Sequence, residues 1–201
     1  RLVCNRAPVG SRGEAGDSWN RGRDPIPTIA AVQGKVIAGG LMLMWVCDII
    51  IASDDASFRD MTVEFGVNGV EWFNHPWEFG IRKAKELLFT GDAIDATEAH
   101  RLGMVNHVVP ADELLDFSLS MAERIAQKPS FSLKLAKMAV NQTLDAQGFM
   151  VSQQQAFGLQ HLGHAHARGE HLRATGTDLF PGADRPRKPF AEPPSDQPKE
   201  S

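Results

Sequence analysis

A chain of 201 residues with a net charge of −4 has the size and charge of an ordinary globular domain. The length is sufficient for one hydrophobic core. The mild acidity argues against nucleic acid and against an anionic membrane surface as partners. No apolar run reaches the roughly 18 residues that predict a membrane-spanning helix. The two cysteines, Cys4 and Cys47, lie in unlike surroundings, so we expect free thiols and a cytoplasmic location.

Both ends of the chain are expected to be irregular. Residues 1–24 are rich in Arg, Gly and Ser, show no periodicity, and contain no apolar segment typical of a secretory signal. From Ala174 onward prolines and charged residues dominate, which predicts a disordered tail over 174–201. Because the chain begins with Arg1 rather than Met, we expect a fragment of a longer protein.

The first regular elements are predicted between residues 28 and 53. β-Branched and small residues bounded by proline and glycine predict a buried strand over Thr28–Gly34. The stretch Gly39–Cys47 is apolar all round and predicts a buried helix. Asp48–Ser53 again has the composition of a buried strand. Two parallel strands joined by a helix would form a right-handed crossover.

A long loop and two helices are expected next. Residues 59–80 are rich in aromatic side chains and lack a clear period, as is typical of functional loops. A helix is predicted over Ile81–Phe89. A second helix has Asp95 as its expected N-cap, Glu98 in the capping-box position, and Gly103 at its end.

A last strand over 104–110 is followed only by helical patterns. The helices are predicted at Asp112–Lys128, Ser130–Asp145 and Phe149–Ala167. The order of elements predicts an α/β protein with a helical C-terminal part. Its expected divisions are an irregular segment over 1–24, an α/β core over 25–110, a helical region over 111–173 and the tail over 174–201.

Three small residues, Ala38, Gly39 and Gly40, stand directly before the first apolar helix. The first N–H groups of a helix have no acceptor inside it, and the helix dipole adds partial positive charge there. Small residues let a substrate oxygen approach such groups closely. These are the properties of an oxyanion hole. The alternative interpretation is that the small residues only allow the helix to pack tightly against the strand.

Three segments carry a longer pattern. The first, "PIPTIAAVQGKVIAGGLMLMWVCDIIIASDDASF", combines a Pro-x-Ile-Ala-Ala-Val-x-Gly strand, a small-residue turn, a helix and Cys-Asp-Ile. The second is "AKELLFTGDAIDATEAHRLGMVNHVVPADEL" and the third "AERIAQKPSFSLKLAKMAVNQ". In this order, over roughly residues 25–170, the segments resemble the enoyl-CoA hydratase/isomerase family, whose members are also called crotonases.

The resemblance implies a fold, an assembly and a chemistry. The fold is a spiral of β-β-α units with a helical C-terminal region that forms trimers or dimers of trimers. The spiral is incomplete here, because the family's first strands and its Ala-Gly-x-Asp turn have no counterpart in the sequence. The family's chemistry passes acyl-CoA thioesters through an enolate, whose oxygen rests on two backbone N–H groups. Coenzyme A is then part of the substrate, and no separate cofactor is expected.

The resemblance assigns roles to the glycine turn and its surroundings. Gly39 would be the second donor to the thioester oxygen, with Ala38 and Gly40 contacting the substrate; the first donor belongs to the missing turn. Members with two catalytic glutamates carry them where this chain has Met42 and Thr62. Neither side chain is an acid or base near neutral pH, so that mechanism does not transfer and both remain candidate substrate contacts.

Other residues are therefore the candidate acids and bases. Some family members place an acid just after a loop glycine, and Gly69 and Glu71 stand near that place. A carboxylate among apolar neighbours would be desolvated, which raises its pKa, so Glu71 is the first candidate. Asp60 is the second, and His75 is a third. The alternatives are that Glu71 is a salt-bridged loop residue and that His75 is a structural hydrogen-bonding group.

Three further features have both a functional and a structural interpretation. Trp72 is expected to line an acyl pocket. Lys137 could reach the phosphates of coenzyme A, although a solvated helix face explains it as well. His161 and His164 stand three residues apart on one predicted helix, but no carboxylate accompanies them at a metal-binding spacing, so we expect no metal.

These observations predict an acyl-CoA-processing protein, foremost an enoyl-CoA hydratase. The expected partners are an acyl-CoA substrate and further copies of the chain. An isomerase or thioester hydrolase on the same fold is one alternative. An inactive subunit that only binds coenzyme A or assembles with relatives is the other.

Overall fold

The computed structural model describes residues 3–4 and 25–178, and the expectations for the remainder of 1–24 and for 179–201 lie outside this range. The chain divides into two units, Arg1–Ala167 and Arg168–Ser201. Both sheets belong to the first unit. In the second unit, Nε of Arg168 donates to Oδ1 of Asp178 at 2.7 Å.

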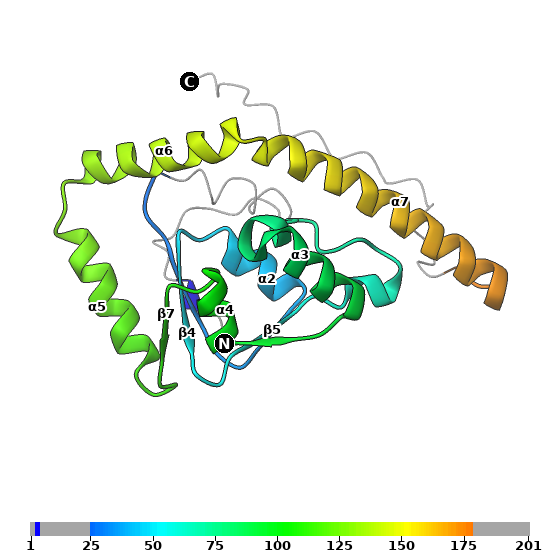
Figure 1. Cartoon of the computed structure of the whole chain (residues 1–201), viewed down its shortest axis with the longest axis horizontal. Coiled ribbons are helices and arrows are strands. Elements are labelled where there is room, and N and C mark those ends of the chain that lie inside the picture. Colours follow the sequence, from blue (N-terminus) through cyan, green and yellow to red (C-terminus); the bar gives the residue numbers. More distant parts are fainter. Residues whose placement is uncertain (1–2, 5–24, 179–201) are drawn as a thin grey trace, which may run out of the picture. The chain divides into compact units, whose positions relative to one another are not determined.

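The larger sheet confirms the two predicted strands and their parallel pairing. Its order is β1 (Val3–Cys4), β2 (Ile29–Val32), β4 (Ile49–Ser53) and β7 (His107–Val109). β2 lies parallel to β4, and β4 lies parallel to β7, whereas β1 is antiparallel to β2. Figure 1 shows β4 and β7 side by side.

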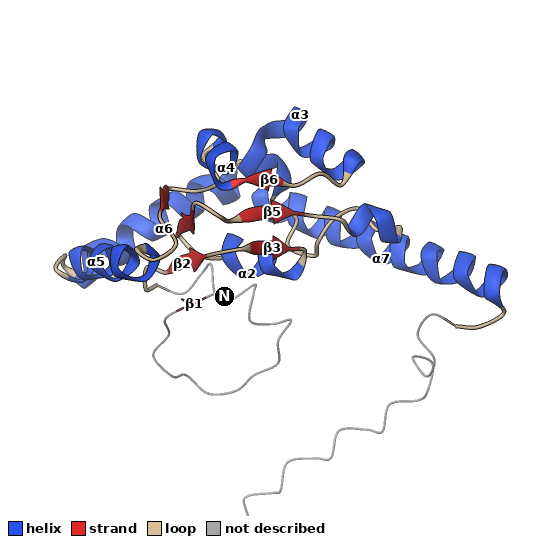
Figure 2. Ribbon diagram, turned by 90° about the horizontal axis from the view of Figure 1, so that it is seen from below, coloured by secondary structure: helices blue, strands red, loops and turns tan. Residues whose placement is uncertain are grey.

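A second sheet of very short strands is absent from the sequence prediction. It consists of β3 (Lys35–Ile37), β5 (Ser57–Arg59) and β6 (Ile94–Asp95), seen one above another in Figure 2. β3 lies parallel to β5, and β6 is antiparallel to it. Strands of two or three residues are too short to show an alternating pattern, so composition alone does not reveal them.

Alternating side chains of the larger sheet enter two hydrophobic clusters. Ala30 and Val32 of β2 and Ile50 and Ala52 of β4 join the main core, together with α2 (Gly39–Trp45). The intervening residues face α5 (Leu114–Ala126), which packs on β2 and β4. Both faces of the sheet are thus covered, which explains why its strands read as continuous apolar runs.

Helix α3 (His75–Thr90) begins six residues before the predicted start at Ile81. Gly80 interrupts it with φ 71° and ψ 162°, so the regular part begins at the predicted position. The loop before it contains a 3-10 helix, η1 (Thr62–Phe65). The early first turn was missed because the break at Gly80 disrupts the helical period.

Helix α4 (Ala96–Leu102) confirms the predicted cap in part. The Asp95 carboxylate accepts a hydrogen bond from the backbone N–H of Glu98 at 2.8 Å, and Gly103 ends the helix with φ 91°. The Glu98 side chain does not return to the cap as a full capping box requires. It pairs instead with Arg101, whose Nε donates to it at 2.6 Å.

The C-terminal part of the chain is helical, as predicted. After α5 come α6 (Ser130–Ala146) and α7 (Phe149–Thr175), which extends eight residues past its predicted end. Figure 1 shows α6 and α7 following one another along the chain. No residue of α6 is buried, whereas α7 buries Phe149, Gln153, Ala156 and Gln160.

Candidate active site

The glycine turn has a strained backbone. Ala38 precedes α2 with φ 44° and ψ −104°, a region that non-glycine residues rarely occupy. Its N–H donates to the carbonyl of Arg59 at 3.0 Å, and its own carbonyl accepts from Leu41 at 2.9 Å. The turn is thereby attached to the end of β5. Strain of this kind is concentrated at functional sites, where the surrounding structure maintains it.

The two glycines of the turn have different surroundings. A Cβ atom on Gly40 would lie 3.1 Å from Cγ1 of Val36, so Gly40 allows close packing between α2 and β3. A Cβ atom on Gly39 would meet nothing within 4 Å, and Gly39 is exposed. The packing interpretation therefore accounts for Gly40 and not for Gly39, which stands at the open start of the helix.

The loop after β5 is organised around Asp60, which is 7% exposed. Its Oδ1 accepts hydrogen bonds from the N–H and the hydroxyl of Thr62, at 2.9 and 2.7 Å. Its Oδ2 accepts from the N–H of Val70 at 3.0 Å and lies 2.8 Å from Nε2 of His75. Burial by itself raises the pKa of Asp60, but the hydrogen bonds from His75 and Thr62 outweigh it and hold that pKa below its ordinary value.

His75 is buried within an aromatic cage. Its ring centroid lies 4.9 Å from that of Trp45 and 4.7 Å from that of Phe73. Gly69 belongs to the same cluster, since a Cβ atom there would lie 2.7 Å from the Phe73 ring and 3.3 Å from His75. The structure thus brings together four of the predicted residues, Asp60, Thr62, Gly69 and His75. They adjoin the glycine turn, because the N–H of Ala38 donates a hydrogen bond to the carbonyl of Arg59, the residue before Asp60.

Glu71 does not have the predicted surroundings. Its neighbours Val70 and Trp72 are 3% and 7% exposed, but Glu71 itself is exposed to solvent. The prediction that it is desolvated is therefore wrong. The loop turns its two apolar neighbours inward and the carboxylate outward, an alternation that composition alone does not reveal. A catalytic role for Glu71 stays a prediction.

Trp72 and Lys137 line a cavity of about 560 Å³ at the far end of α2. A seven-residue helix spans about 10 Å, so this cavity lies away from the glycine turn. Nζ of Lys137 lies 2.7 Å from Oδ2 of Asp48 and 3.1 Å from the carbonyl oxygen of Ile26, and its side chain is 7% exposed. The structure thus places Lys137 in an ion pair rather than on a solvated face. Met42 is half-buried and packs against the main core.

Glu78 lines the same cavity and was not singled out in the sequence. Burial raises its pKa to about 7, and the hydrogen bond from Nδ2 of Asn74, at 2.7 Å, opposes this shift. Nothing in the sequence pattern distinguishes Glu78 from an ordinary helix residue, because its burial depends on α3 lying beside the end of α2.

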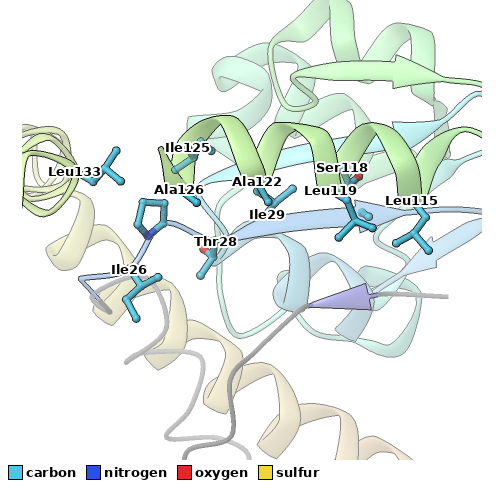
Figure 3. Close-up of a pocket in the computed structure, with 12 residues that line it drawn as sticks. Ile26, Thr28, Ile29, Leu115, Ser118, Leu119, Ala122, Ile125, Ala126 and Leu133 are labelled. Carbon is cyan, nitrogen blue, oxygen red and sulfur yellow. The ribbon is translucent and has the colours of Figure 1, made fainter. Parts of the chain in front are cut away.

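A second cavity, of about 300 Å³, contains none of the predicted site residues. Figure 3 shows it between α5 and the chain entering β2, with Leu115, Leu119 and Ile125 on one side and Ile26 and Ile29 on the other. Its lining is almost entirely apolar, and it offers no group for acid–base chemistry.

Gln153 of α7 is a further residue that the sequence did not indicate. It is fully buried, accepts a hydrogen bond from the N–H of Phe73 at 2.8 Å, and donates to the Phe73 carbonyl at 3.1 Å and to Asn74 at 3.0 Å. α7 is thereby fastened to the loop that carries Glu71. A glutamine within a long polar helix gives no sequence signal for this role.

Neither metal ligands nor membrane spans stand out in the part of the chain that the structure describes. Over 3–4 and 25–178, no three His, Cys, Asp or Glu residues are grouped so as to hold a metal ion. The ring of His161 meets that of Phe157 edge-on, with ring centroids 4.4 Å apart. Among the same residues, no helix combines the length and apolar character needed to traverse a bilayer.

Comparison with known proteins relates this arrangement to a large family. The model of the enoyl-CoA hydratase/isomerase family matches residues 11–176. A putative enoyl-CoA hydratase of Mycobacterium tuberculosis, EchA13, is 53% identical over 140 residues, which cover 69% of this chain and 44% of the relative. A crotonyl-CoA hydratase of Syntrophomonas wolfei is 38% identical over 139 residues, 66% of this chain and 53% of the relative.

Solved structures give the same result. A probable enoyl-CoA hydratase from Mycobacterium thermoresistibile superposes with a TM-score of 0.76 at 49% identity, over 78% of this chain and 66% of that one. A second, from Mycobacterium smegmatis, has a TM-score of 0.74 at 50% identity, over 79% and 64%. The crotonase fold is thus confirmed, and the chain spans about half the length of the two curated relatives above. The chain belongs to the enoyl-CoA hydratase/isomerase family.

Proposed function

We propose that this chain carries the second oxyanion donor and the proton-transfer loop of an enoyl-CoA hydratase. One observation carries the proposal. Gly39, an exposed residue, begins a helix after a strained residue, and a Cβ atom built on it would meet nothing within 4 Å. A thioester oxygen placed there would accept a hydrogen bond from Gly39 and be stabilised further as it becomes an enolate.

Glu71 is the residue we assign to proton transfer. A general base needs lone pairs that the substrate can reach, and the exposed carboxylate of Glu71 has them. Asp60 fits this role less well, because its two oxygens already accept four hydrogen bonds and its pKa is lowered. His75 is 1% exposed, which also argues against direct contact with a substrate.

Hydration of crotonyl-CoA by the full chain tests the proposal. The reaction is monitored by the loss of ultraviolet absorbance of crotonyl-CoA. We expect turnover, and we expect Glu71→Gln to lower kcat by about 10²–10⁴-fold, the usual contribution of a general acid or base. Glu123→Gln is the matched control, since Glu123 is an exposed carboxylate of α5. An unaltered chain without turnover, or a Glu71→Gln variant as active as the control, would contradict the assignment.

Isomerisation of a 3-enoyl-CoA is the second candidate. It needs one base that moves a proton along the acyl chain, whereas hydration must also activate water. Met42 and Thr62 stand where two-glutamate members carry their acids, which favours the simpler reaction. Turnover of a 3-enoyl-CoA without hydration of crotonyl-CoA would support it.

The expected homo-oligomer belongs to the same proposal. Large apolar side chains of α6 are exposed, among them Phe131 at 70% and Val140 at 68%. Faces of this kind commonly form contacts between subunits. Light scattering on the purified chain tests the expected trimer or dimer of trimers, and a monomer at micromolar concentration would contradict it.

A further inference from the structure

We propose that Asp60 and His75 are positioning residues, whose hydrogen bond closes the loop over residues 60–75 and holds Glu71 in place for the reaction. The inference rests on the proposed function, in which Glu71 transfers the proton. It gives Asp60 and His75 a role that is neither nucleophilic nor acid–base, and it explains why two polar groups are buried beside the glycine turn.

The carboxylate of Asp60 joins three separate points of the loop. Its Oδ1 holds both donors of Thr62, and its Oδ2 holds the N–H of Val70 together with Nε2 of His75. Because one rigid carboxylate makes all four bonds, these points cannot move independently. Val70 directly precedes Glu71, so the bond to its N–H fixes the chain one residue from the proposed base.

The orientation of His75 is fixed by packing as well as by this bond. Trp45 meets its ring edge-on, and Phe73 and Phe79 lie against it at centroid distances of 4.7 and 6.3 Å. An ionised carboxylate only accepts hydrogen bonds, so Nε2 carries the proton that joins the pair. Nδ1 has no hydrogen-bond partner among the described residues. The ring therefore contributes one polar contact, directed at Asp60.

Helix α7 also holds the same loop. Gln153 bonds both backbone groups of Phe73, and Nδ2 of Asn68 donates to the carbonyl of Ala156 at 3.2 Å. A Cβ atom on Gly163 would lie 2.8 Å from the carbonyl oxygen of Gly66, so the helix touches the loop backbone there. Glu71 is exposed between Val70, whose N–H donates to Asp60, and Phe73, whose backbone groups bond Gln153.

Two amide variants of His75 separate the hydrogen bond from the volume of the side chain. In Gln the amide nitrogen is as many bonds from Cβ as Nε2 is in His, so His75→Gln can still donate to Asp60. In Asn the amide nitrogen corresponds to Nδ1 of His and does not reach the carboxylate of Asp60. Both variants lose the aromatic ring, which makes each the control for the other.

Crotonyl-CoA hydration and amide hydrogen exchange by the full chain are measured for both variants. We expect His75→Asn to lower kcat by about 10–100-fold relative to His75→Gln with KM changed less than about twofold, because misplacement of a catalytic group affects the transition state more than binding. The Val70 amide should exchange faster in His75→Asn than in His75→Gln.

Equal kcat values for the two variants, at any level, would overturn the positioning role. Absence of turnover in the unaltered chain would overturn the proposed hydratase; the exchange rates then decide the loop closure alone, and equal rates at Val70 would overturn it too. If His75→Asn fails to fold, Asp60→Asn takes its place. That variant keeps the acceptor for Thr62 but presents an amide N–H₂ group to the Val70 N–H, so the same losses are expected.

Discussion

The α/β core buries its large apolar side chains, whereas helix α6 exposes them. Val32, Met44 and Ile51 of the core are fully buried, whereas Phe131 and Val140 of α6 are about two-thirds exposed. The core is therefore stabilised by its own packing. α6 has no buried residue; Leu144 packs against the main core from a partly buried position, and Lys137 forms an ion pair with Asp48. The predictions below test this contrast, from the largest expected effect to the smallest.

A substitution that creates a cavity in the core should have the largest effect on the free energy of unfolding. Met44→Ala removes a fully buried side chain of α2 and should lower the free energy of unfolding by about 2–5 kcal/mol. Met138→Ala on α6, where the side chain is 50% exposed, is the matched control and should change it by less than about 1 kcal/mol. Urea denaturation measures both, and equal losses would remove the contrast.

Loss of the Lys137 ammonium should have an intermediate effect. Lys137→Met keeps the aliphatic stem but leaves Asp48 without its cation, so we expect a loss of about 1–3 kcal/mol, less than for a fully buried pair because Asp48 is partly exposed. Lys134→Met, an exposed lysine one turn earlier, should leave stability unchanged within about 0.5 kcal/mol. A neutral result for Lys137→Met would show that α6 is not held by this bond.

The carboxyl of Glu78 should make stability depend on pH. Its pKa is about 7 in the folded chain against 4.5 for an ordinary glutamate, so the folded chain binds the extra proton between these values. The contribution of the Glu78 carboxyl to the free energy of unfolding is then complete below about pH 4.5 and is lost as the pH rises through 7. Glu78→Gln should be more stable than the unaltered chain at pH 8, by about 1–2 kcal/mol after allowing for partial exposure, and should lose this advantage at pH 5. Thermal melts at the two values measure it, and a constant difference would contradict the assignment.

Polar substitution on α6 should have the smallest effect. Val140→Thr places a hydroxyl on a side chain that is 68% exposed, so we expect a change below about 0.5 kcal/mol in the monomeric chain. If the chain assembles through this face, the same variant should weaken assembly measurably. Light scattering across a dilution series separates the two results.

Local chemistry allowed the sequence to predict the main strands and the α4 cap. β2 and β4 are continuous β-branched runs, and Asp95 and Gly103 have residue types that favour the ends of a helix. The turn before α2 was predicted as well, because Gly39 and Gly40 precede an apolar helix. These features depend on neighbouring residues, so single-sequence reasoning can identify them.

The organisation of the loop depended on contacts between distant residues. Asp60 and His75 are fifteen positions apart, and Gln153 is eighty positions from the Phe73 backbone that it binds. No periodicity links such residues, so Asp60 and His75 were predicted as catalytic candidates and not as a pair. The exposure of Glu71 was missed for the same reason: which side of an irregular loop faces solvent is decided by the core beneath it.

The parallel pairing of β4 with β7 has a consequence during synthesis. β4 ends at Ser53, but its partner residues end at Val109, so one edge of β4 stays without this partner while the intervening chain is made. At about 5–20 residues per second the delay is roughly 3–11 s, much longer than the microseconds in which a hairpin forms. An apolar strand such as Ile49–Ser53 is a template for wrong pairing during that time. Between the emergence of β4 and that of β7, the unpaired edge of β4 therefore gives the nascent chain a site for aggregation.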